Sequence, residues 1–235
     1  MVQEVKPLYP MRINKYLASR GYSTRTEADT LIEKGLITIN GKEAVLGQKV
    51  LEKDTVQVLG PKKKYRYYAY NKPFGVITHS PQLGEKDVLT ASGLLGVFPV
   101  GRLDKRSSGL LILTDDARIT DRLLSPVYVH EKEYRISTRE DLPSYFKKRM
   151  EGGVDIEGYT TKKCSVQLEG DKRFSIILTE GKKHQIRRMC AALGVEISTL
   201  ERVRVANIKI GSLKSNAYRD IAGTELQTFL TSLSL

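Results

Sequence analysis

A charged turn followed closely by an apolar strand constrains this chain more than any other feature. The turn is Gly101-Arg102-Leu103-Asp104, and the apolar run covers residues 110–113. A buried strand of this kind would hold the preceding turn rigidly and present Asp104 at a fixed place beside a cation. An aspartate in a turn is more often a cap or an ion-pair partner, and this segment alone favours that interpretation.

The longer string from 101 to 115 changes the interpretation. Gly-Arg-Leu-Asp at 101–104, followed by Ser-Ser-Gly-Leu-Leu-Ile-Leu-Thr-Asp at 107–115, closely resembles the catalytic motif of RsuA-type ribosomal RNA pseudouridine synthases. The resemblance implies that Asp104 is the nucleophile or general base of a uridine isomerisation. It implies that Arg102 helps to displace the target base and binds phosphate. No metal or other cofactor is expected for this reaction.

Three later residues match further positions of the same family. Tyr134 corresponds to the aromatic residue that stacks on uracil, and Arg187 to the arginine that pairs with the catalytic aspartate. Leu178 corresponds to a residue that packs under the uracil. Without the motif, Tyr134 would be interpreted as a strand aromatic, Arg187 as a surface arginine and Leu178 as a core residue.

The chain departs from the family pattern just before Arg187. RsuA-type enzymes often have Asn-Arg before Gln-Ile-Arg, where this chain has Lys183-His184. Histidine at this place is similar to the branch that modifies other RNA sites. The departure bears on the choice of RNA rather than on the chemistry.

Residues 1–60 have the pattern of a small separate module. A helix is expected over 11–18, and a second helix begins at a capping box formed by Thr24 and Glu27. A strand over 36–39 leads into Asn40-Gly41, a strong hairpin signal, and a last strand covers 55–59.

This module resembles the RNA-binding module named after ribosomal protein S4. The matching segments are Arg12-Ile13-Asn14-Lys15-Tyr16-Leu17, Ser23-x-Arg25-x-x-Ala28 and Ile37-Thr38-Ile39-Asn40-Gly41. The resemblance implies that Arg12, Lys15 and Arg25 contact RNA phosphates, and a solvated helix face is the alternative.

A basic linker at 61–66 is expected to join this module to a catalytic domain over 67–235. Alternating apolar patterns predict strands in the second domain over 67–72, 131–136, 163–168, 173–178 and 200–210. Helical spacing and end signals predict helices over 117–124, 141–152, 186–193 and 224–230. The expected fold is therefore α+β, with a two-helix-plus-sheet module and a mixed, mainly antiparallel sheet with peripheral helices.

The charge of the chain predicts a polyanionic partner. The formal net charge is +12 and the pI about 9.6, which favours nucleic acid as the partner. The family resemblance implies that this partner is ribosomal RNA or a partly assembled ribosomal subunit. Two cysteines and three scattered histidines have no metal-ligand spacing. No apolar run predicts a membrane span or a signal peptide, so a cytoplasmic location is expected. The chain is also expected to act as a monomer.

Two other functions remain open from the sequence. A glycosidase would need a second carboxylate beside Asp104, but Asp115 and Asp116 lie at the far end of the strand and are expected to cap a helix. A catalytically silent RNA-binding assembly factor would have the same charge and the same N-terminal module. The combination of Asp104, Tyr134 and Arg187 favours a pseudouridine synthase over the silent factor. The expected substrate is ribosomal RNA of the large subunit.

Overall fold

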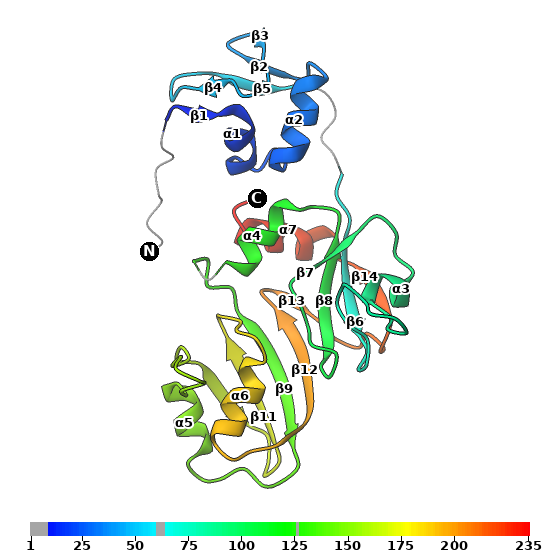
Figure 1. The fold of residues 1–235 in the computed structure, drawn as a ribbon, viewed down its shortest axis with the longest axis vertical. Coiled ribbons are helices and arrows are strands. Elements are labelled where there is room, and N and C mark those ends of the chain that lie inside the picture. The colour runs from blue at the N-terminus through cyan, green and yellow to red at the C-terminus, as the bar shows by residue number, and fades with distance from the viewer. Residues whose placement is uncertain (1–8, 60–63, 126) are drawn as a thin grey trace. The chain divides into compact units, whose positions relative to one another are not determined.

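The computed structural model describes residues 9–59, 64–125 and 127–235, which form two compact units (Figure 1). One unit runs to Lys64 and includes Ser234–Leu235, and the other spans Tyr65–Leu233. Residues 61–63 of the expected linker lie outside the described residues.

The N-terminal unit packs two helices against short strands. The helices are α1 (Ile13–Ser19) and α2 (Arg25–Glu33). The strands are β1 (Met11–Arg12), β2 (Ile37–Ile39), β3 (Lys42–Glu43), β4 (Lys49–Val50) and β5 (Val56–Val58). All pairings are antiparallel, β1 with β4 and β2 with both β3 and β5. A shared core of apolar side chains from both helices and the strands holds the unit together.

The capping box at the start of α2 is confirmed. The Glu27 amide donates to Thr24 Oγ1 at 3.1 Å, and the Thr24 amide donates to Glu27 Oε2 at 3.0 Å. The expected start of the first helix at Met11 is wrong, because Met11 and Arg12 pair with Val50 and Lys49 as strand β1. That backbone pairing outweighs the helical pattern of the side chains.

The larger unit is built on one nine-stranded sheet. Its strands are β6 (Tyr67–Lys72), β7 (Phe98–Val100), β8 (Ser108–Thr114), β9 (Lys132–Thr138), β10 (Ser165–Leu168), β11 (Arg173–Leu178), β12 (Ile197–Val205), β13 (Ile208–Lys209) and β14 (Tyr218–Asp220). The order along the sheet is β10-β11-β9-β12-β8-β6-β14, with β13 beside β12 and β7 beside β8. Only β12 and β8 pair in parallel among the described strands. The sheet is therefore mixed and mainly antiparallel, as expected.

Five helices of the described part of the chain lie around this sheet (Figure 1). They are α3 (Val88–Ser92), α4 (Arg118–Leu124), α5 (Phe146–Gly152), α6 (Gln185–Ala192) and α7 (Gly223–Ser232). Helices α5 and α6 share one apolar core with β9, β10, β11 and β12, in which Phe146, Phe174 and Met189 are fully buried. Helix α3 closes a smaller core over β6 and β8. The overall α+β class is confirmed.

The largest differences from the expected boundaries in this unit are at α5 and β12. Helix α5 begins at Phe146 rather than near Asp141, because the Leu142 amide donates to the Asp171 oxygen and ties this segment to another loop. The expected strand over 200–210 begins earlier and turns back at Ala206, whose φ is 50°, to form β13.

The two aspartates after β8 have different partners. Asp116 accepts from the Arg118 amide at 3.1 Å at the start of α4, and its carboxylate binds the Arg118 guanidinium at 2.7 Å. Asp115 instead accepts from the Arg66 amide at 2.7 Å. Of the two, only Asp116 therefore accepts a hydrogen bond from the first turn of α4. Both carboxylates form hydrogen bonds within the fold.

Candidate active site

The Asp104 turn lies between β7 and β8 and is fixed by backbone bonds. The Ser107 amide donates to the Asp104 oxygen at 2.9 Å. The buried Thr78 hydroxyl accepts from the Leu103 amide at 3.0 Å and donates to the Leu103 oxygen at 2.7 Å. The Asp104 side chain is nevertheless 39% exposed. This geometry agrees with the expectation that the turn is rigid and that the Asp104 carboxylate is accessible.

The direct partner of the Asp104 carboxylate is His184. Its Nδ1 atom lies 2.9 Å from Asp104 Oδ2. His184 is the residue before α6 and has a left-handed backbone, with a φ of 52°. A non-glycine residue in this conformation is uncommon, and such residues often belong to functional sites. No role for His184 was predicted from the sequence, although the Lys183-His184 departure from the family pattern singles it out.

A buried carboxylate anchors the loop that carries His184. Glu180 accepts from the Tyr159 hydroxyl at 2.5 Å, from the Lys162 amide at 3.0 Å and from Gln185 Nε2 at 2.7 Å. Burial alone would raise the pKa of Glu180, but these hydrogen bonds outweigh it and the pKa is lowered. Gln185 Oε1 in turn accepts from the Lys182 amide at 2.9 Å. Glu180 and Gln185, one before and one after His184, are thus bonded to each other and fix the loop before α6.

Arg187 projects from α6 toward the same turn. Its Nη2 atom donates to the Arg106 oxygen at 2.6 Å and lies 3.5 Å from Ser107 Oγ. Burial lowers the pKa of Arg187, and the negative charge of Asp104 acts in the opposite direction. Among the described residues Arg187 forms no ion pair with Asp104 within 4.0 Å, so it supports the backbone of the turn instead.

A row of cross-strand neighbours runs across the sheet behind the turn. Lys72 on β6 lies opposite Gly109 on β8, Gly109 opposite Arg202 on β12, and Arg202 opposite Tyr134 on β9. An added Cβ at Gly109 would lie 2.3 Å from the Arg202 backbone oxygen, and its φ is 106°. Only glycine therefore allows β8 and β12 to approach this closely at the base of the turn.

Lys72 is a fully buried cation in this row. Burial lowers the pKa of Lys72 to about 8, against the opposing effect of the Asp104 charge, while the Arg202 charge lowers it further. Its Nζ atom donates to the backbone oxygens of Pro73 at 2.9 Å and Val76 at 2.6 Å. Lys72 thus adds positive charge near Asp104, a role that was not predicted from the sequence.

Two expected substrate-binding residues lie on neighbouring strands. Tyr134 on β9 is half-buried and packs against the core shared by α5 and α6. Leu178, the last residue of β11, is buried in the same core at 3% exposure. Arg102 is exposed and, within the part of the chain that the structure describes, has no hydrogen bond or ion pair.

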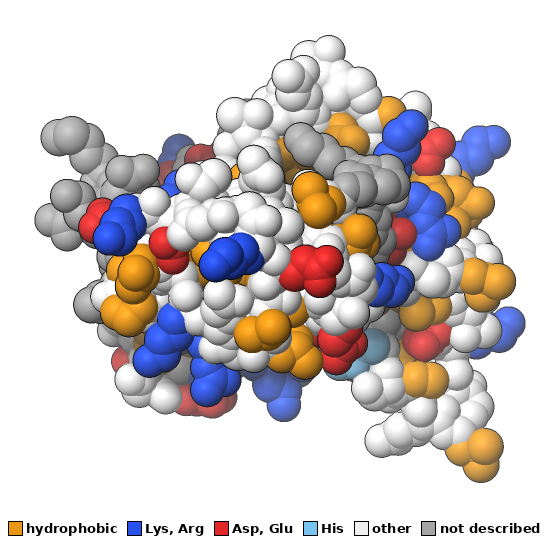
Figure 2. All heavy atoms as spheres, turned by 90° about the horizontal axis from the view of Figure 1, so that it is seen from above, with side chains coloured by type: hydrophobic (Ala, Val, Ile, Leu, Met, Phe, Trp, Pro, Cys, Tyr) orange, Lys and Arg blue, Asp and Glu red, His pale blue; other side chains and the backbone are white. Residues whose placement is uncertain are grey.

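The basic residues expected to bind RNA in the N-terminal unit are at its surface. Arg12 on β1, Lys15 on α1 and Arg25 at the start of α2 are all exposed. The space-filling view shows lysine and arginine side chains at several separate places on one face (Figure 2). No helix among the described residues is both long and apolar enough to cross a membrane.

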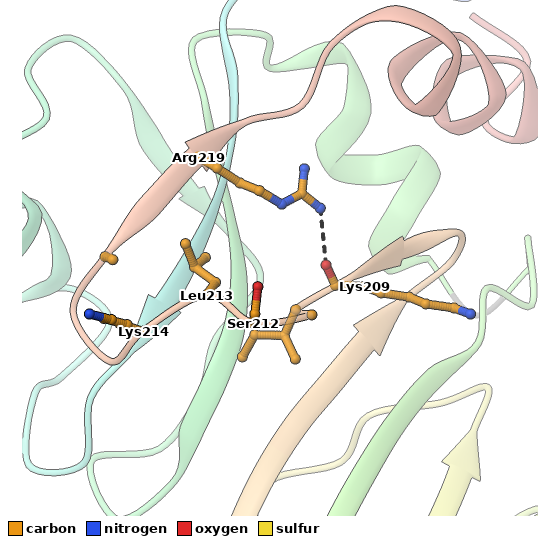
Figure 3. Close-up of a pocket in the computed structure, with 8 residues that line it drawn as sticks. Lys209, Ser212, Leu213, Lys214 and Arg219 are labelled. Carbon is orange, nitrogen blue, oxygen red and sulfur yellow. Dashed lines mark hydrogen bonds between the residues drawn. The ribbon is translucent and has the colours of Figure 1, made fainter.

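A separate concavity lies between β13 and β14 (Figure 3). Its lining includes Lys209, Ser212, Lys214 and Arg219, and the Arg219 guanidinium donates to the Lys209 oxygen at 3.0 Å. Arg219 also binds both carboxylate oxygens of Glu225, which offsets its charge. No acidic residue lines this concavity among the described residues.

The sequence carries two recognised domains, one within each of these units. A family described as RNA pseudouridylate synthase matches residues 66–192, and the S4 domain matches residues 11–56. The chain belongs to the RNA pseudouridylate synthase family. The matched region of this pseudouridine synthase contains Asp104, Tyr134, His184 and Arg187.

Individual relatives agree with this membership. The enzyme is 37% identical to the dual-specificity RNA pseudouridine synthase RluF of Salmonella typhi, over 92% of this chain and 77% of the relative. It is 31% identical to ribosomal large subunit pseudouridine synthase B of Bacillus subtilis, over 92% of this chain and 94% of the relative. A pseudouridylate synthase crystal structure superposes with a TM-score of 0.68 at 24% identity, covering 95% of this chain and 99% of that one. The last match supports the fold.

Proposed function

We propose that this pseudouridine synthase isomerises a uridine of large-subunit ribosomal RNA, with Asp104 as nucleophile or general base. The observation that carries the proposal is the accessible Asp104 carboxylate, held 2.9 Å from His184 on a turn bound by Arg187. A carboxylate oxygen that is accessible and fixed in place can attack a substrate atom or remove a proton.

The target uridine must leave its stack before Asp104 can reach it. Extruding a base costs on the order of a few kcal/mol. In this proposal Arg102 takes part in displacing the base and binds phosphate, while Tyr134 stacks on the uracil and Leu178 packs beneath it. The exposed position of Arg102 and the adjacent strands of Tyr134 and Leu178 are compatible with these roles.

Binding of the surrounding RNA is assigned to the N-terminal module. Arg12, Lys15 and Arg25 are exposed cations on an S4 domain, suited to phosphate contacts. The proposal includes an RNA-binding module over 1–60, a linker over 61–66 and a catalytic domain over 67–235. It also has the enzyme acting as a cytoplasmic monomer on ribosomal RNA or a partly assembled subunit.

The choice of large-subunit RNA rests on the relatives rather than on the site. One relative carries that substrate in its name, and another is described as dual-specificity. His184 of the Lys183-His184 pair lies beside Asp104, so this pair is the first place to look for a difference in substrate.

Mapping pseudouridines in total cellular RNA, with and without this gene, tests the proposal. The expected result is one or a few large-subunit sites that disappear on deletion and return with the parent gene. An unchanged pattern would support the silent assembly factor instead. If the sites that disappear lie only in small-subunit or transfer RNA, the proposed isomerisation would stand, but the proposed large-subunit substrate would be wrong.

A further inference from the structure

Phe74 is a large apolar side chain that is 67% exposed close to the Asp104 turn. Single exposed apolar residues are common and need no explanation by themselves. What sets Phe74 apart is how firmly its backbone is held in place and which turn it is tied to.

The turn that carries Phe74 is clamped by one buried ammonium group. Lys72 Nζ donates to the oxygen of Pro73 on one side of Phe74 and to the oxygen of Val76 on the other. The Gly75 amide donates to the Lys105 oxygen at 2.8 Å, and Lys105 directly follows Asp104. The backbone on both sides of Phe74 is therefore fixed by hydrogen bonds. The next residue, Gly75, is bonded to the turn that carries Asp104.

Exposed cations lie on the Asp104 turn, to which the residue after Phe74 is bonded through its backbone amide. Arg102, Lys105 and Arg106 are all exposed, although Lys105 is paired with Glu85 at 2.8 Å. An aromatic face beside cations is the arrangement with which proteins hold unpaired nucleotides, since the ring stacks on a base and the cations bind phosphate.

We propose that Phe74 is a stacking platform for a nucleobase next to the uridine that reacts. This inference rests on the proposed position of the reaction at Asp104. When the uridine leaves the helix, its neighbour loses a stacking partner, and an aromatic ring fixed at the edge of the site replaces that partner.

The test compares full-length Phe74→Ala and Phe74→Tyr with Leu95→Ala as a matched control. Leu95 is 84% exposed and precedes Gly96, whose oxygen accepts from Arg66 at the opposite end of β6. The substrate is ribosomal RNA purified from cells that lack the gene. The measured quantities are its affinity and the single-turnover rate at saturating enzyme.

We expect Phe74→Ala to weaken RNA affinity on the order of tenfold to a hundredfold. Phe74→Tyr keeps the stacking face and should remain close to the parent, as should Leu95→Ala. Parental affinity in Phe74→Ala would overturn the inference. A loss seen with ribosomal particles but not with purified RNA would also overturn it, because the partner would then be a protein.

A cross-link locates the base directly. Phe74→p-benzoylphenylalanine, irradiated with the same RNA, should attach to a nucleotide adjacent to the modified uridine, with the same substitution at Leu95 as control. Attachment to a remote nucleotide would contradict the inference. Activity retained by Asp104→Asn would overturn the proposed catalytic residue instead, so the two failures are distinguishable.

Discussion

The imidazole Nδ1 of His184 lies 2.9 Å from the carboxylate Oδ2 of Asp104, although 80 positions separate the two residues in the chain. Both side chains remain accessible, at 45% and 39% exposure respectively. The pair joins the turn before β8 to the start of α6. Asp104 therefore has a partner that fixes its orientation while part of the carboxylate stays open to RNA.

Arg187 supports this pair through the backbone, which predicts a loss of rate when it is changed. Arg187→Met removes the bond to the Arg106 oxygen and a charge near Asp104. Turnover should fall at least about tenfold, equivalent to about 1.4 kcal/mol in the barrier. Arg187→Lys should be intermediate, because a lysine cannot reproduce the planar guanidinium.

Arg188→Met is the matched control for that experiment. Arg188 is the next residue of α6, but it donates to the Ile156 oxygen and to Glu157, away from Asp104. Its turnover should stay near the parent once unfolding temperatures show that both variants are folded. Equal losses in the two variants would indicate a general effect on α6.

The buried Lys72 predicts a pH dependence of stability. Its pKa is about 8 in the folded chain and near 10.5 in the unfolded one, because burial disfavours the charged form. Between these values the unfolded chain binds more protons, so the free energy of unfolding should rise with pH across this window. The rise should approach roughly 3 kcal/mol.

Urea unfolding of the parent and Lys72→Met from pH 7 to pH 10.5 measures this contribution. The parent should gain stability relative to Lys72→Met as the pH rises, since methionine has no proton to lose. A difference in unfolding free energy that stays constant with pH would contradict the lowered pKa of Lys72. Subtracting the unfolding free energy of one protein from that of the other removes the contributions of groups that titrate in both.

Gly109→Ala tests the close approach of β8 and β12. The added Cβ would meet the Arg202 backbone oxygen at 2.3 Å, and we expect a loss of about 3 kcal/mol or more in unfolding free energy. Gly170→Ala is the control, because Gly170 also has a positive φ, 127°, but open space around it. Its loss should be only about 1–2 kcal/mol. Similar losses would attribute the whole effect to the backbone angle.

Several parts of the fold follow from local sequence signals. The capping box, the Asn40-Gly41 hairpin and the paired strands β10 and β11 depend on residues close together in the chain. The strand at Met11 and the late start of α5 do not, because each is decided by backbone bonds to a distant segment. Local patterns carry no information about such partners.

Some residues of the candidate site could be proposed from the sequence, but its geometry could be predicted only in part. Asp104, Arg187 and Tyr134 could be proposed from motifs, and the fold brings the first two to the same turn. The bond from His184 to Asp104 depends on a left-handed residue before α6, and the position of Lys72 depends on the register of β6 with β8. Neither can be read from residue spacing alone.

The exposed cations of the N-terminal module predict the salt dependence of RNA binding. Removing one phosphate-binding cation should reduce the slope of log affinity against log salt by about 0.7 to 0.9. Replacing Arg12, Lys15 and Arg25 together by glutamine should therefore reduce the slope by about 2 to 3. The control replaces Lys147, Lys148 and Arg149 on α5, which removes the same charge. Equal reductions would show an effect of net charge rather than of specific binding by the N-terminal module.

Asp104→Asn is the most direct test of the central claim, because it keeps the shape of the side chain and removes its charge. The measurement is single-turnover pseudouridine formation on ribosomal RNA from cells that lack the gene, with RNA affinity measured in parallel. The control is Asp141→Asn, an exposed aspartate whose ion-pair partner is Lys172. The account predicts no detectable pseudouridine with Asp104→Asn, near-parental affinity, and a parental rate for the control. Appreciable pseudouridine formation by Asp104→Asn would contradict it.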